Sequence, residues 1–405
     1  MRMKKILLLG GSAQQVVAIK TAKKLGYYTV LCDFLTDNPG QYVADKFYLV
    51  STTDKKAVLK VAKEEKVDGV LAYASDPAAP TAAYVAEYMG LPTNPYEAVQ
   101  ILSEKHLFRK YLEEHNFETP KSIAFHAKEY SLQTEELISK LTFPVLVKPV
   151  DSSGSKGITM LESVRELDNA IKYAEGFSRN KILQIEEYLT KDHEYLVGGD
   201  IFVLDGKIVF WGLLNCHRDS RVNALVPVGK SYPLNLDENR KQLIRNELQR
   251  LISSLKISFG AFNIELIITK EEKLYFIEVG PRNGGNMIPD LLSYISGKNM
   301  IQASIKGAMG DRDVDIAFEG KKVFFATHNL HSNKNGILDK VVFSKKIVPY
   351  IIRKELYKNK GDEVYYFDGA NKALGIVFFK FNNLKIMNEI LLNIGEYIQV
   401  KVEER

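Results

Sequence analysis

Two glutamates in the second half of the chain, Glu265 and Glu278, have the spacing of a cation site. They lie in the stretch GAFNIELIITKEEKLYFIEVG, whose pattern predicts a β-hairpin that turns at residues 271–272. If Lys270 and Lys273 flank that turn, the two glutamates stand directly opposite each other, with Cβ atoms about 5 Å apart. Two carboxylates at that distance repel each other unless a proton or a cation joins them. The hairpin therefore predicts a cation site, and a register slip of one residue would abolish it.

An arginine follows the second glutamate after a short break. The stretch IEVGPRNGGN at 277–286 ends the strand with Gly-Pro and then presents Arg282. A guanidinium so close to two carboxylates is placed to meet a transferring phosphoryl group, and we predict a catalytic role for Arg282. Oxygen ligands beside phosphates favour Mg²⁺, with Mn²⁺ as the alternative ion. Asn283 or Asn286 could add a further oxygen to such a site.

The stretch FPVLVKPVDSSGSKGITM at 143–160 predicts a hairpin flap that closes over phosphates. Its first strand carries Lys148, and a loop of small residues from Ser152 to Gly157 leads into the second strand. Small residues let backbone N–H groups approach an anion closely, and Lys156 adds positive charge. The loop is not a Walker A motif, because GxxxxGK[ST] is absent. A mobile hairpin with a solvated lysine is the structural alternative.

The stretch 181–214 offers a second contact surface for a nucleotide. Its first strand ends in Glu-Glu-Tyr-Leu at residues 186–189, and Glu194 follows after a short polar connection. A strand edge of this kind can offer backbone groups to an adenine and a carboxylate to ribose hydroxyls, although charged strand ends are often only solvated. Further along, Asp205-Gly206 predicts a type I′ turn between two strands.

The elements that must position these residues differ along the chain. Up to residue 95, strands and helices alternate at short spacing, which predicts a parallel, doubly wound α/β sheet. The turn Gly10-Gly11-Ser12 does not complete GxGxxG, so a nicotinamide site is disfavoured. The expected elements are the strand Ile6–Leu9, the helix Gln14–Leu25, a strand ending at Asp33, the helix Lys55–Glu65, a strand in DGVLAYASD and the helix Pro80–Met89.

From residue 96 onward the pattern predicts α+β domains built on antiparallel sheets. We expect helices at 96–115 and 237–255, hairpin-rich segments at 143–162, 182–214 and 260–280, tail strands near 321–328 and 374–381, and a final helix from Leu384. The predicted domains are 1–95, then 96–310 with a flap lobe at about 120–190, and a smaller α+β domain at 311–405.

Composition limits the setting and the partners. The 405 residues are 45% apolar and 26% charged, with a net charge of +5 and no separate basic block, so nucleic acid is not an expected partner. The only two cysteines, Cys32 and Cys216, argue against a disulfide framework and for a reducing compartment. No apolar run reaches the length of a membrane span, and MRMKKILLLGG lacks a signal-peptide cleavage site. We expect a cytoplasmic protein without a membrane partner.

The order of these motifs resembles the ATP-grasp superfamily over roughly residues 1–310. The resemblance implies a doubly wound pre-ATP-grasp domain, a two-lobed ATP-grasp domain that grips ATP with Mg²⁺, and acyl-phosphate chemistry. Many members have asparagine two residues after the second metal glutamate, where this chain has Gly280. By position, the resemblance implies nucleotide-binding roles for Lys105, Lys148, Ser153, Gly154, Ser155, Lys156, Gly157, Glu186, Glu187, Tyr188, Leu189 and Glu194, metal roles for Glu265 and Glu278, and a catalytic role for Arg282.

The motif VKPVDSSGSKG resembles both the amino-acid ligase branch and the purine branch that handles glycinamide ribonucleotide. The tail stretch DGANKALGIVFFK resembles the closing domain of both, but it carries only Lys372 where the purine branch often has paired arginines. We therefore expect an ATP-dependent carboxylate–amine ligase that forms an acyl phosphate and releases ADP and phosphate. A purine-biosynthesis enzyme of the phosphoribosylglycinamide synthetase or formyltransferase type is the second interpretation. A non-catalytic nucleotide-binding sensor is the third.

The expected partners are ATP, a small carboxylic acid and an amine, and a homodimer stays open. The stretch NCHRDSRVN at 215–223 is the candidate substrate-side segment. Its two arginines, Arg218 and Arg221, could hold the carboxylate of the acid. A solvated loop is the alternative for both. The sequence does not name the acid or the amine.

Overall fold

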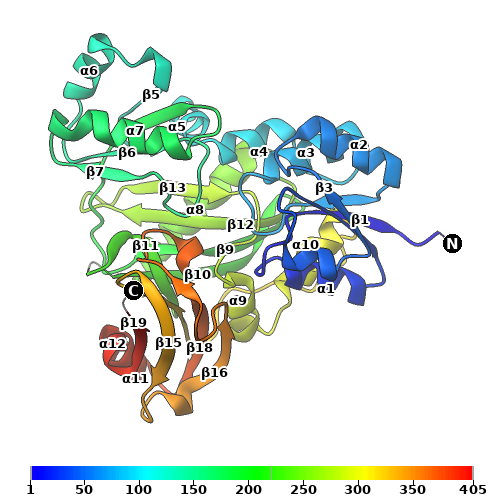
Figure 1. Ribbon diagram of the computed structural model, residues 1–405. Helices are drawn as coiled ribbons and strands as arrows, with labels where there is room; N and C mark the ends of the chain where they lie inside the picture. Colours follow the sequence, from blue (N-terminus) through cyan, green and yellow to red (C-terminus); the bar gives the residue numbers. More distant parts are fainter. Residues whose placement is uncertain (1, 220, 404–405) are drawn as a thin grey trace.

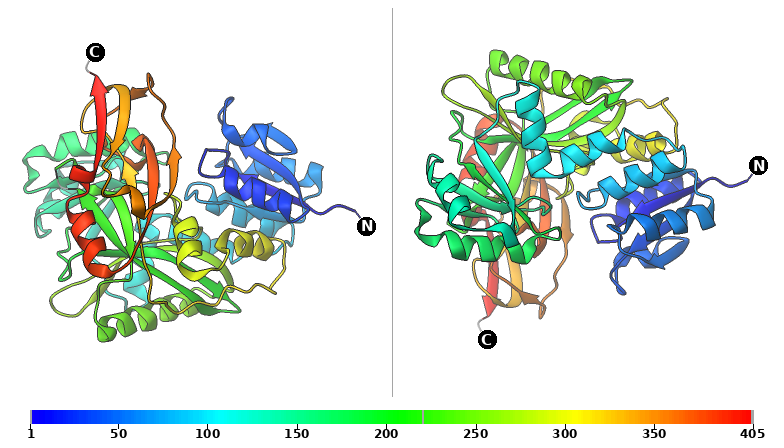
Figure 2. Two further views of the ribbon diagram at one scale, coloured as in Figure 1. Left: turned by 90° about the horizontal axis from the view of Figure 1, so that it is seen from below. Right: turned by 90° about the horizontal axis from the view of Figure 1, so that it is seen from above.

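The computed structural model describes residues 2–219 and 221–403. Within these residues the chain forms four β-sheets with helices packed on them, which confirms the mixed α/β and α+β class (Figures 1 and 2). Figure 1 shows the N-terminal sheet on one side of a large central sheet, and a smaller lobe above the central sheet. None of the described helices has the length and the apolar character that crossing a membrane requires.

The N-terminal sheet is parallel and covered by helices on both faces, as predicted. Its strand order is β3-β2-β1-β4, and the strands are β1 (Lys5–Leu9), β2 (Tyr28–Asp33), β3 (Lys46–Leu49) and β4 (Gly69–Leu71). One face packs on α2 (Lys55–Glu65), α3 (Ala79–Tyr88) and α4 (Tyr96–Ser103).

The other face of the N-terminal sheet is covered by two helices that are distant in sequence. One is α1 (Val16–Lys24), and the other is α10 (Met300–Ala308). Ile301 and Ile305 of α10 join the apolar cluster that contains Ile6 of β1. The chain thus returns to the N-terminal sheet through α10.

The helix predicted at 96–115 is two helices, α4 and α5 (Lys105–Glu114). The break is at Glu104, whose backbone is extended, with φ −115° and ψ 113°. The prediction was wrong because the apolar periodicity continues across the break. The break lets α5 begin at Lys105, whose backbone N–H donates to the Val150 carbonyl at 3.1 Å. The first residue of α5 is therefore tied to the segment that follows the flap strand.

The lobe above the central sheet is a four-stranded sheet with the order β5-β8-β6-β7. Buried Val145, Val147, Leu183 and Ile185 make the centre of its core, which also packs on α7. Its elements are β5 (Ser122–His126), α6 (Leu132–Ser139), β6 (Val145–Pro149), β7 (Thr159–Leu161), α7 (Leu167–Phe177) and β8 (Ile182–Glu187).

The central sheet has eight strands, in the order β13-β12-β9-β10-β11-β14-β18-β16. The strands that follow residue 310 pair directly with those that precede it, so one sheet spans both sides of that predicted boundary. The division into three domains stays a prediction. The strands are β9 (Leu196–Leu204), β10 (Lys207–Asp219), β11 (Asn223–Tyr232), β12 (Phe259–Ile268), β13 (Leu274–Gly280), β14 (Phe324–Leu330), β16 (Ile351–Leu356) and β18 (Gly375–Phe381).

The C-terminal part adds a small sheet beside β14 and β18. It consists of β17 (Glu363–Val364), β15 (Gly336–Phe343) and β19 (Ile398–Glu403), with α11 (Leu384–Leu392) and α12 (Ile394–Tyr397) packed nearby. The predicted helix from Leu384 is α11, but it is not the last element, because β19 follows it. The residues of β19 pair with β15. The sequence analysis predicted neither of these two strands.

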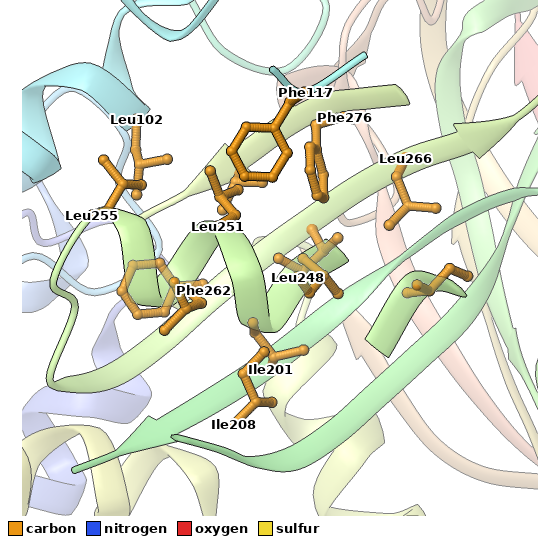
Figure 3. Close-up of a cluster of buried hydrophobic side chains, with 14 of the residues drawn as sticks. Leu102, Phe117, Ile201, Ile208, Leu248, Leu251, Leu255, Phe262, Leu266 and Phe276 are labelled. Carbon is orange, nitrogen blue, oxygen red and sulfur yellow. The ribbon is translucent and has the colours of Figure 1, made fainter. Parts of the chain in front are cut away.

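The core beneath the candidate site is formed by the long helix α8 (Glu238–Ser254) on one face of the central sheet, while α9 (Ile288–Ser296) covers part of the other. Figure 3 shows Leu248 and Leu251 of α8 among Phe262 of β12 and Phe276 of β13. Burying such a side chain contributes about 1.5–3 kcal/mol each. This core holds β12 and β13 in place, and side chains that alternate with it, such as Glu265, point to the opposite face.

Candidate functional site

The hairpin of β12 and β13 places Glu265 opposite Glu278, as the sequence predicted. The turn differs from the prediction. Thr269 and Lys273 flank a three-residue loop, with the Thr269 N–H donating to the Lys273 carbonyl at 3.0 Å, and Glu272 has φ +57°. A three-residue loop of this kind ends in a left-handed residue. Taken alone, this turn would shift the pairing by one residue.

A β-bulge in β13 restores the predicted pairing. Leu266 pairs with Phe276, and the next pair is Glu265 with Glu278, so Ile277 is the extra residue on its strand. The guanidinium of Arg109 donates to the carbonyls of Phe276 at 3.0 Å and Ile277 at 3.1 Å. The two glutamates therefore face each other because of a bulge that a side chain from α5 holds in place.

Arg109 also belongs to a buried ion group with Lys148 and Glu186. Arg109 Nε donates to Glu186 Oε2 at 3.0 Å, and Lys148 Nζ donates to Glu186 Oε1. Burial opposes ionisation of Glu186, but the charges of Arg109 and Lys148 outweigh it and hold the pKa of Glu186 below its usual range. For Lys148 burial is the dominant effect, and it lowers the pKa of the ammonium group although the charge of Glu186 acts in the opposite direction.

The ion group changes how Glu186 can serve a nucleotide. Its side chain is occupied by the two cations and by Gln184, and its backbone is paired with β5 and β6 inside the sheet, so a base would have to meet the residues that follow it. The sequence analysis did not identify Arg109. A signal was present, because Arg109 lies four residues after Lys105, which places both on one face of the same helix.

The flap loop between β6 and β7 is built on left-handed backbone. Gly154, Ser155 and Gly157 have φ of +68°, +60° and +76°. Ser155 Oγ donates to the Leu225 carbonyl of β11 at 2.8 Å, and Lys105 Nζ donates to the Ser152 carbonyl at 2.7 Å. The flap loop is therefore tied to the central sheet through Ser155 and to α5 through Lys105.

A cleft of about 590 Å³ lies between the flap lobe and the central sheet. This volume is in the range of pockets that hold small ligands. Two predicted residues are not among the described residues that line it: Arg282, which lines a second, smaller cavity, and Gly157, which packs against Phe177. The predicted residues that line it are Lys105, Lys148, Ser153, Gly154, Ser155, Lys156, Glu186, Glu187, Tyr188, Leu189, Glu194, Glu265 and Glu278.

Positive charge gathers beside Glu265 on the floor of the cleft. Arg218 Nη2 lies 3.5 Å from one carboxylate oxygen, and Lys230 Nζ lies 3.8 Å from the other. Lys230, which the sequence analysis did not identify, is buried and also donates to the Cys216 thiol. Arg221, the second arginine predicted on the substrate side, instead pairs with Asp219 at 2.9 Å and is 75% exposed.

The glutamate pair fits a hard divalent cation. Burial raises the pKa of Glu278, with Lys105 opposing that rise and the Asp76 and Glu265 carboxylates adding to it. Among residues 2–219 and 221–403, no group of three or more His, Cys, Asp and Glu side chains is arranged to hold a metal. Two carboxylates suit an ion that takes its remaining oxygens from phosphates and water, which is the usual mode of Mg²⁺.

The parallel N-terminal sheet, the closing flap and the paired carboxylates define an ATP-grasp protein. The family model of the carbamoyl-phosphate synthase L chain ATP-binding domain matches residues 104–313, which is more than half of the chain, and the chain belongs to that family. The resemblance to ATP-grasp ligases that the motifs indicated is thereby confirmed.

Individual proteins show the same likeness over longer stretches. The formate-dependent phosphoribosylglycinamide formyltransferase of Prochlorococcus marinus (strain MIT 9515) is 26% identical over 295 residues, covering 69% of this chain and 70% of that protein. The crystal structure of an L-amino acid ligase from Bacillus licheniformis matches with a TM-score of 0.79 at 17% identity, covering all of both chains. That of a phosphoribosylglycinamide synthetase from Anaerococcus prevotii matches with a TM-score of 0.75 at 20% identity, covering 99% of this chain and all of the other. At these identities the two structures establish the shared fold.

Proposed function

We propose that the protein is an ATP- and Mg²⁺-dependent carboxylate–amine ligase that works through an acyl phosphate and releases ADP and phosphate. The observation that carries this proposal is the direct opposition of Glu265 and Glu278 on the floor of a cleft whose roof is the flap loop. Paired carboxylates facing a phosphate-binding loop suit transfer of a terminal phosphoryl group. A bound Mg²⁺ would supply charge neutralisation there.

The binding roles follow from where side chains enter the cleft. Lys105 and Lys148 come from the flap side and would hold the phosphates together with the backbone of the flap loop. The N–H groups of Glu187 and Tyr188 donate to the Lys121 and Pro144 carbonyls, so the remaining backbone groups at 187–189 would meet the adenine. Glu194, whose carboxylate accepts from Asn235 at 3.0 Å, would meet the ribose hydroxyls. Each of these residues binds or orients ATP.

The acid substrate would bind beside Glu265, where Arg218 and Lys230 supply positive charge. One oxygen of its carboxylate would attack the γ-phosphorus of ATP while the bond to the β-phosphate oxygen breaks, giving ADP and an acyl phosphate. The amine would then attack the acyl carbon, and phosphate would leave with that oxygen. Arg282 would stabilise the charge on the moving phosphoryl group.

The test traces which oxygen atoms reach the released phosphate. The purified protein is incubated with MgATP, mixed amino acids and an acid fraction labelled with oxygen-18 in its carboxylates. We expect ADP as the nucleotide product and the label in released phosphate, because the acyl phosphate passes one carboxyl oxygen to it. Release of AMP, or amide formation with unlabelled phosphate, would contradict the mechanism. Absence of nucleotide turnover with every acid and amine supplied would favour the sensor instead.

A purine-biosynthesis ligase is the second candidate, favoured by the likeness to the Prochlorococcus marinus formyltransferase. In this chain Lys372, which stands where the purine branch often has paired arginines, pairs with Asp368 at 2.8 Å and is thereby occupied. The candidate is tested by supplying phosphoribosylglycinamide with formate and MgATP. ADP formation that needs both compounds would establish it, whereas ADP formation with amino acids alone would exclude it.

A cytoplasmic location is part of the proposal. Its support is that both cysteines, Cys32 and Cys216, are buried and free. Free thiols persist where the surroundings are reducing. Secretion of the intact chain by cells that express it would contradict this location.

A further inference from the structure

Arg282 is held by a carboxylate from the N-terminal part of the chain. Its Nε and Nη2 donate to the two oxygens of Asp76 at 2.6 and 2.5 Å. Asp76 lies in the loop between β4 and α3 of the N-terminal sheet. The two side chains are only 9% and 15% exposed. A two-point pair of this kind fixes the plane of the guanidinium as well as its position.

Gly280 makes the room for this pair. A Cβ at residue 280 would lie 2.9 Å from Asp76 Oδ1 and 3.2 Å from Arg282 Cζ. The backbone of Gly280 is not left-handed, so alanine is compatible with its conformation and would differ only in the added volume. The small size of this residue therefore matters to the side-chain pair.

A second contact ties the same loop to the N-terminal domain. The backbone N–H of Asn286 donates to Gln14 Oε1 at 2.8 Å. Asp76 and Gln14 follow different strands, β4 and β1, at the carboxyl end of the N-terminal sheet. The loop at 281–286 is thus positioned by the N-terminal sheet at two points.

The hydrogen bonds leave part of the guanidinium free. Arginine has five N–H donors in a fixed plane. Asp76 takes two of them, and the Asn283 carbonyl takes one from Nη1 at 3.1 Å. One N–H on each terminal nitrogen has no protein acceptor among the described hydrogen bonds. Two such donors can bind two oxygens of one phosphoryl or carboxylate group.

We propose that Asp76 is a positioning residue, through which the N-terminal domain directs the free donors of Arg282 at the phosphoryl group in transfer. This proposal rests on the proposed function, because it assumes that Arg282 meets that group. It assigns to the N-terminal domain a part in the chemical step. A pair that only joined two domains would affect stability alone.

The test uses MgADP with aluminium fluoride, which imitates a phosphoryl group in transfer. We expect aluminium fluoride to tighten MgADP binding to the wild-type protein. In Asp76→Asn and Asp76→Ala, that tightening should fall about 10- to 100-fold, as for other groups that orient a reacting residue. Affinity for MgADP alone should stay within about threefold of wild type, because ADP lacks the phosphoryl group that Arg282 is proposed to meet.

Gly280→Ala is the second variant, since it displaces the pair without removing a charge. It should lose the tightening as the Asp76 variants do. The matched control is Asp68→Asn, an acid of the same domain that pairs with Arg2 at 2.6 Å, and it should behave as wild type. Any turnover found with mixed amino acids should fall through kcat rather than KM in the Asp76 variants.

Three results would overturn the positioning role. The Asp76 and Gly280 variants could keep the tightening, they could lose MgADP affinity to the same degree, or the wild-type protein could show no tightening at all. Failure of the proposed function has a different signature. It would appear as tightening that depends on Asp76 in a protein that makes no acyl phosphate from any acid supplied.

Discussion

The carboxylate of Glu186 forms ion pairs with two buried cations, and these pairs determine which role its side chain can have. Its carboxylate accepts from Arg109 and Lys148, and both of those side chains are only 4% exposed. Removing one partner of such a group leaves an uncompensated charge in a poorly solvated place. The residue resembles a nucleotide ligand in sequence, yet in the structure its side chain orients the lysine.

Loss of Arg109 should therefore destabilise the protein strongly. We expect Arg109→Met to lower the free energy of unfolding by about 3–5 kcal/mol, the usual cost of breaking a buried ion group. Urea denaturation followed by circular dichroism measures it. The neighbouring Lys110 pairs with Glu114 only at the surface, at 3.8 Å, and is 71% exposed. Lys110→Met should change the stability by less than about 0.5 kcal/mol, and an equal loss in both variants would refute the role of the buried group.

Lys148 and Arg282 should separate binding from turnover. Lys148→Ala is expected to weaken MgADP binding about 10- to 100-fold, the worth of one charge-assisted hydrogen bond. Arg282→Ala should keep that affinity and slow ADP formation about 100- to 1,000-fold, because its donors act on charge that develops during transfer. Calorimetry and an ADP-release assay measure the two effects. The control is Lys140→Ala, which changes an exposed lysine in the same lobe as Lys148. Loss of MgADP binding in both Lys148→Ala and Arg282→Ala would contradict the separation of binding from turnover.

At the scale of elements, the hairpin of β12 and β13 depends on two irregularities that offset each other. The three-residue turn shifts the pairing by one residue, and the bulge at Ile277 shifts it back. The predicted register near the glutamates was confirmed, although the turn that was assumed for it was wrong. A bulge beside a reactive site is a common way to re-aim a side chain.

The opposed glutamates make Mg²⁺ dependence the natural test of this hairpin. ATP should bind more than about tenfold more weakly in EDTA than in Mg²⁺, because Glu265 and Glu278 would otherwise face the triphosphate with negative charge. Glu278→Gln should shrink that difference by removing one of the two charges. Calorimetry in both buffers measures it. Equal affinities for the wild-type protein in EDTA and Mg²⁺ would rule out the cation site.

On the scale of the whole molecule, each of two sheets is completed by a segment from another predicted domain. The central sheet continues from β11 into β14, and the N-terminal sheet is covered by α10. Each segment therefore buries apolar surface that belongs to another. A fragment cut at residue 310 would keep the candidate cleft but would leave β11 as an unpaired edge.

We expect the fragment 1–310 to be soluble only poorly and to lack a cooperative thermal transition. It would lose β14, β16 and β18, and with them the buried Phe325, Ile376 and Phe378 that pack on α9. A chain shortened only by β19, ending at residue 397, should still unfold cooperatively at a lower temperature. Scanning calorimetry on both fragments decides the point. A sharp transition for 1–310 would show that the predicted boundary separates independent domains.

The sequence by itself determined the features that depend on near neighbours in the chain. Alternation of strands and helices predicted the parallel N-terminal sheet, and Asp205-Gly206 predicted the turn that joins β9 to β10 with φ of +49° and +78°. The motifs, together with the resemblance to the ATP-grasp superfamily, also named about half of the described cleft lining, from Lys105 to Glu278. Hydrophobic periodicity and turn preferences are local properties, so a single sequence is enough to read them.

Only the tertiary structure decided which distant side chains meet. Arg109 reaches Glu186 across 77 positions, and Asp76 reaches Arg282 across 206. Such contacts arise when separate elements pack, and no periodicity along the chain encodes them. For the same reason Lys230 and α10 could not be assigned in advance, since their burial depends on strands and helices contributed by other parts of the chain. Sequence motifs could identify residues of the cleft, whereas the packing of the whole fold determines which side chains hold those residues in position.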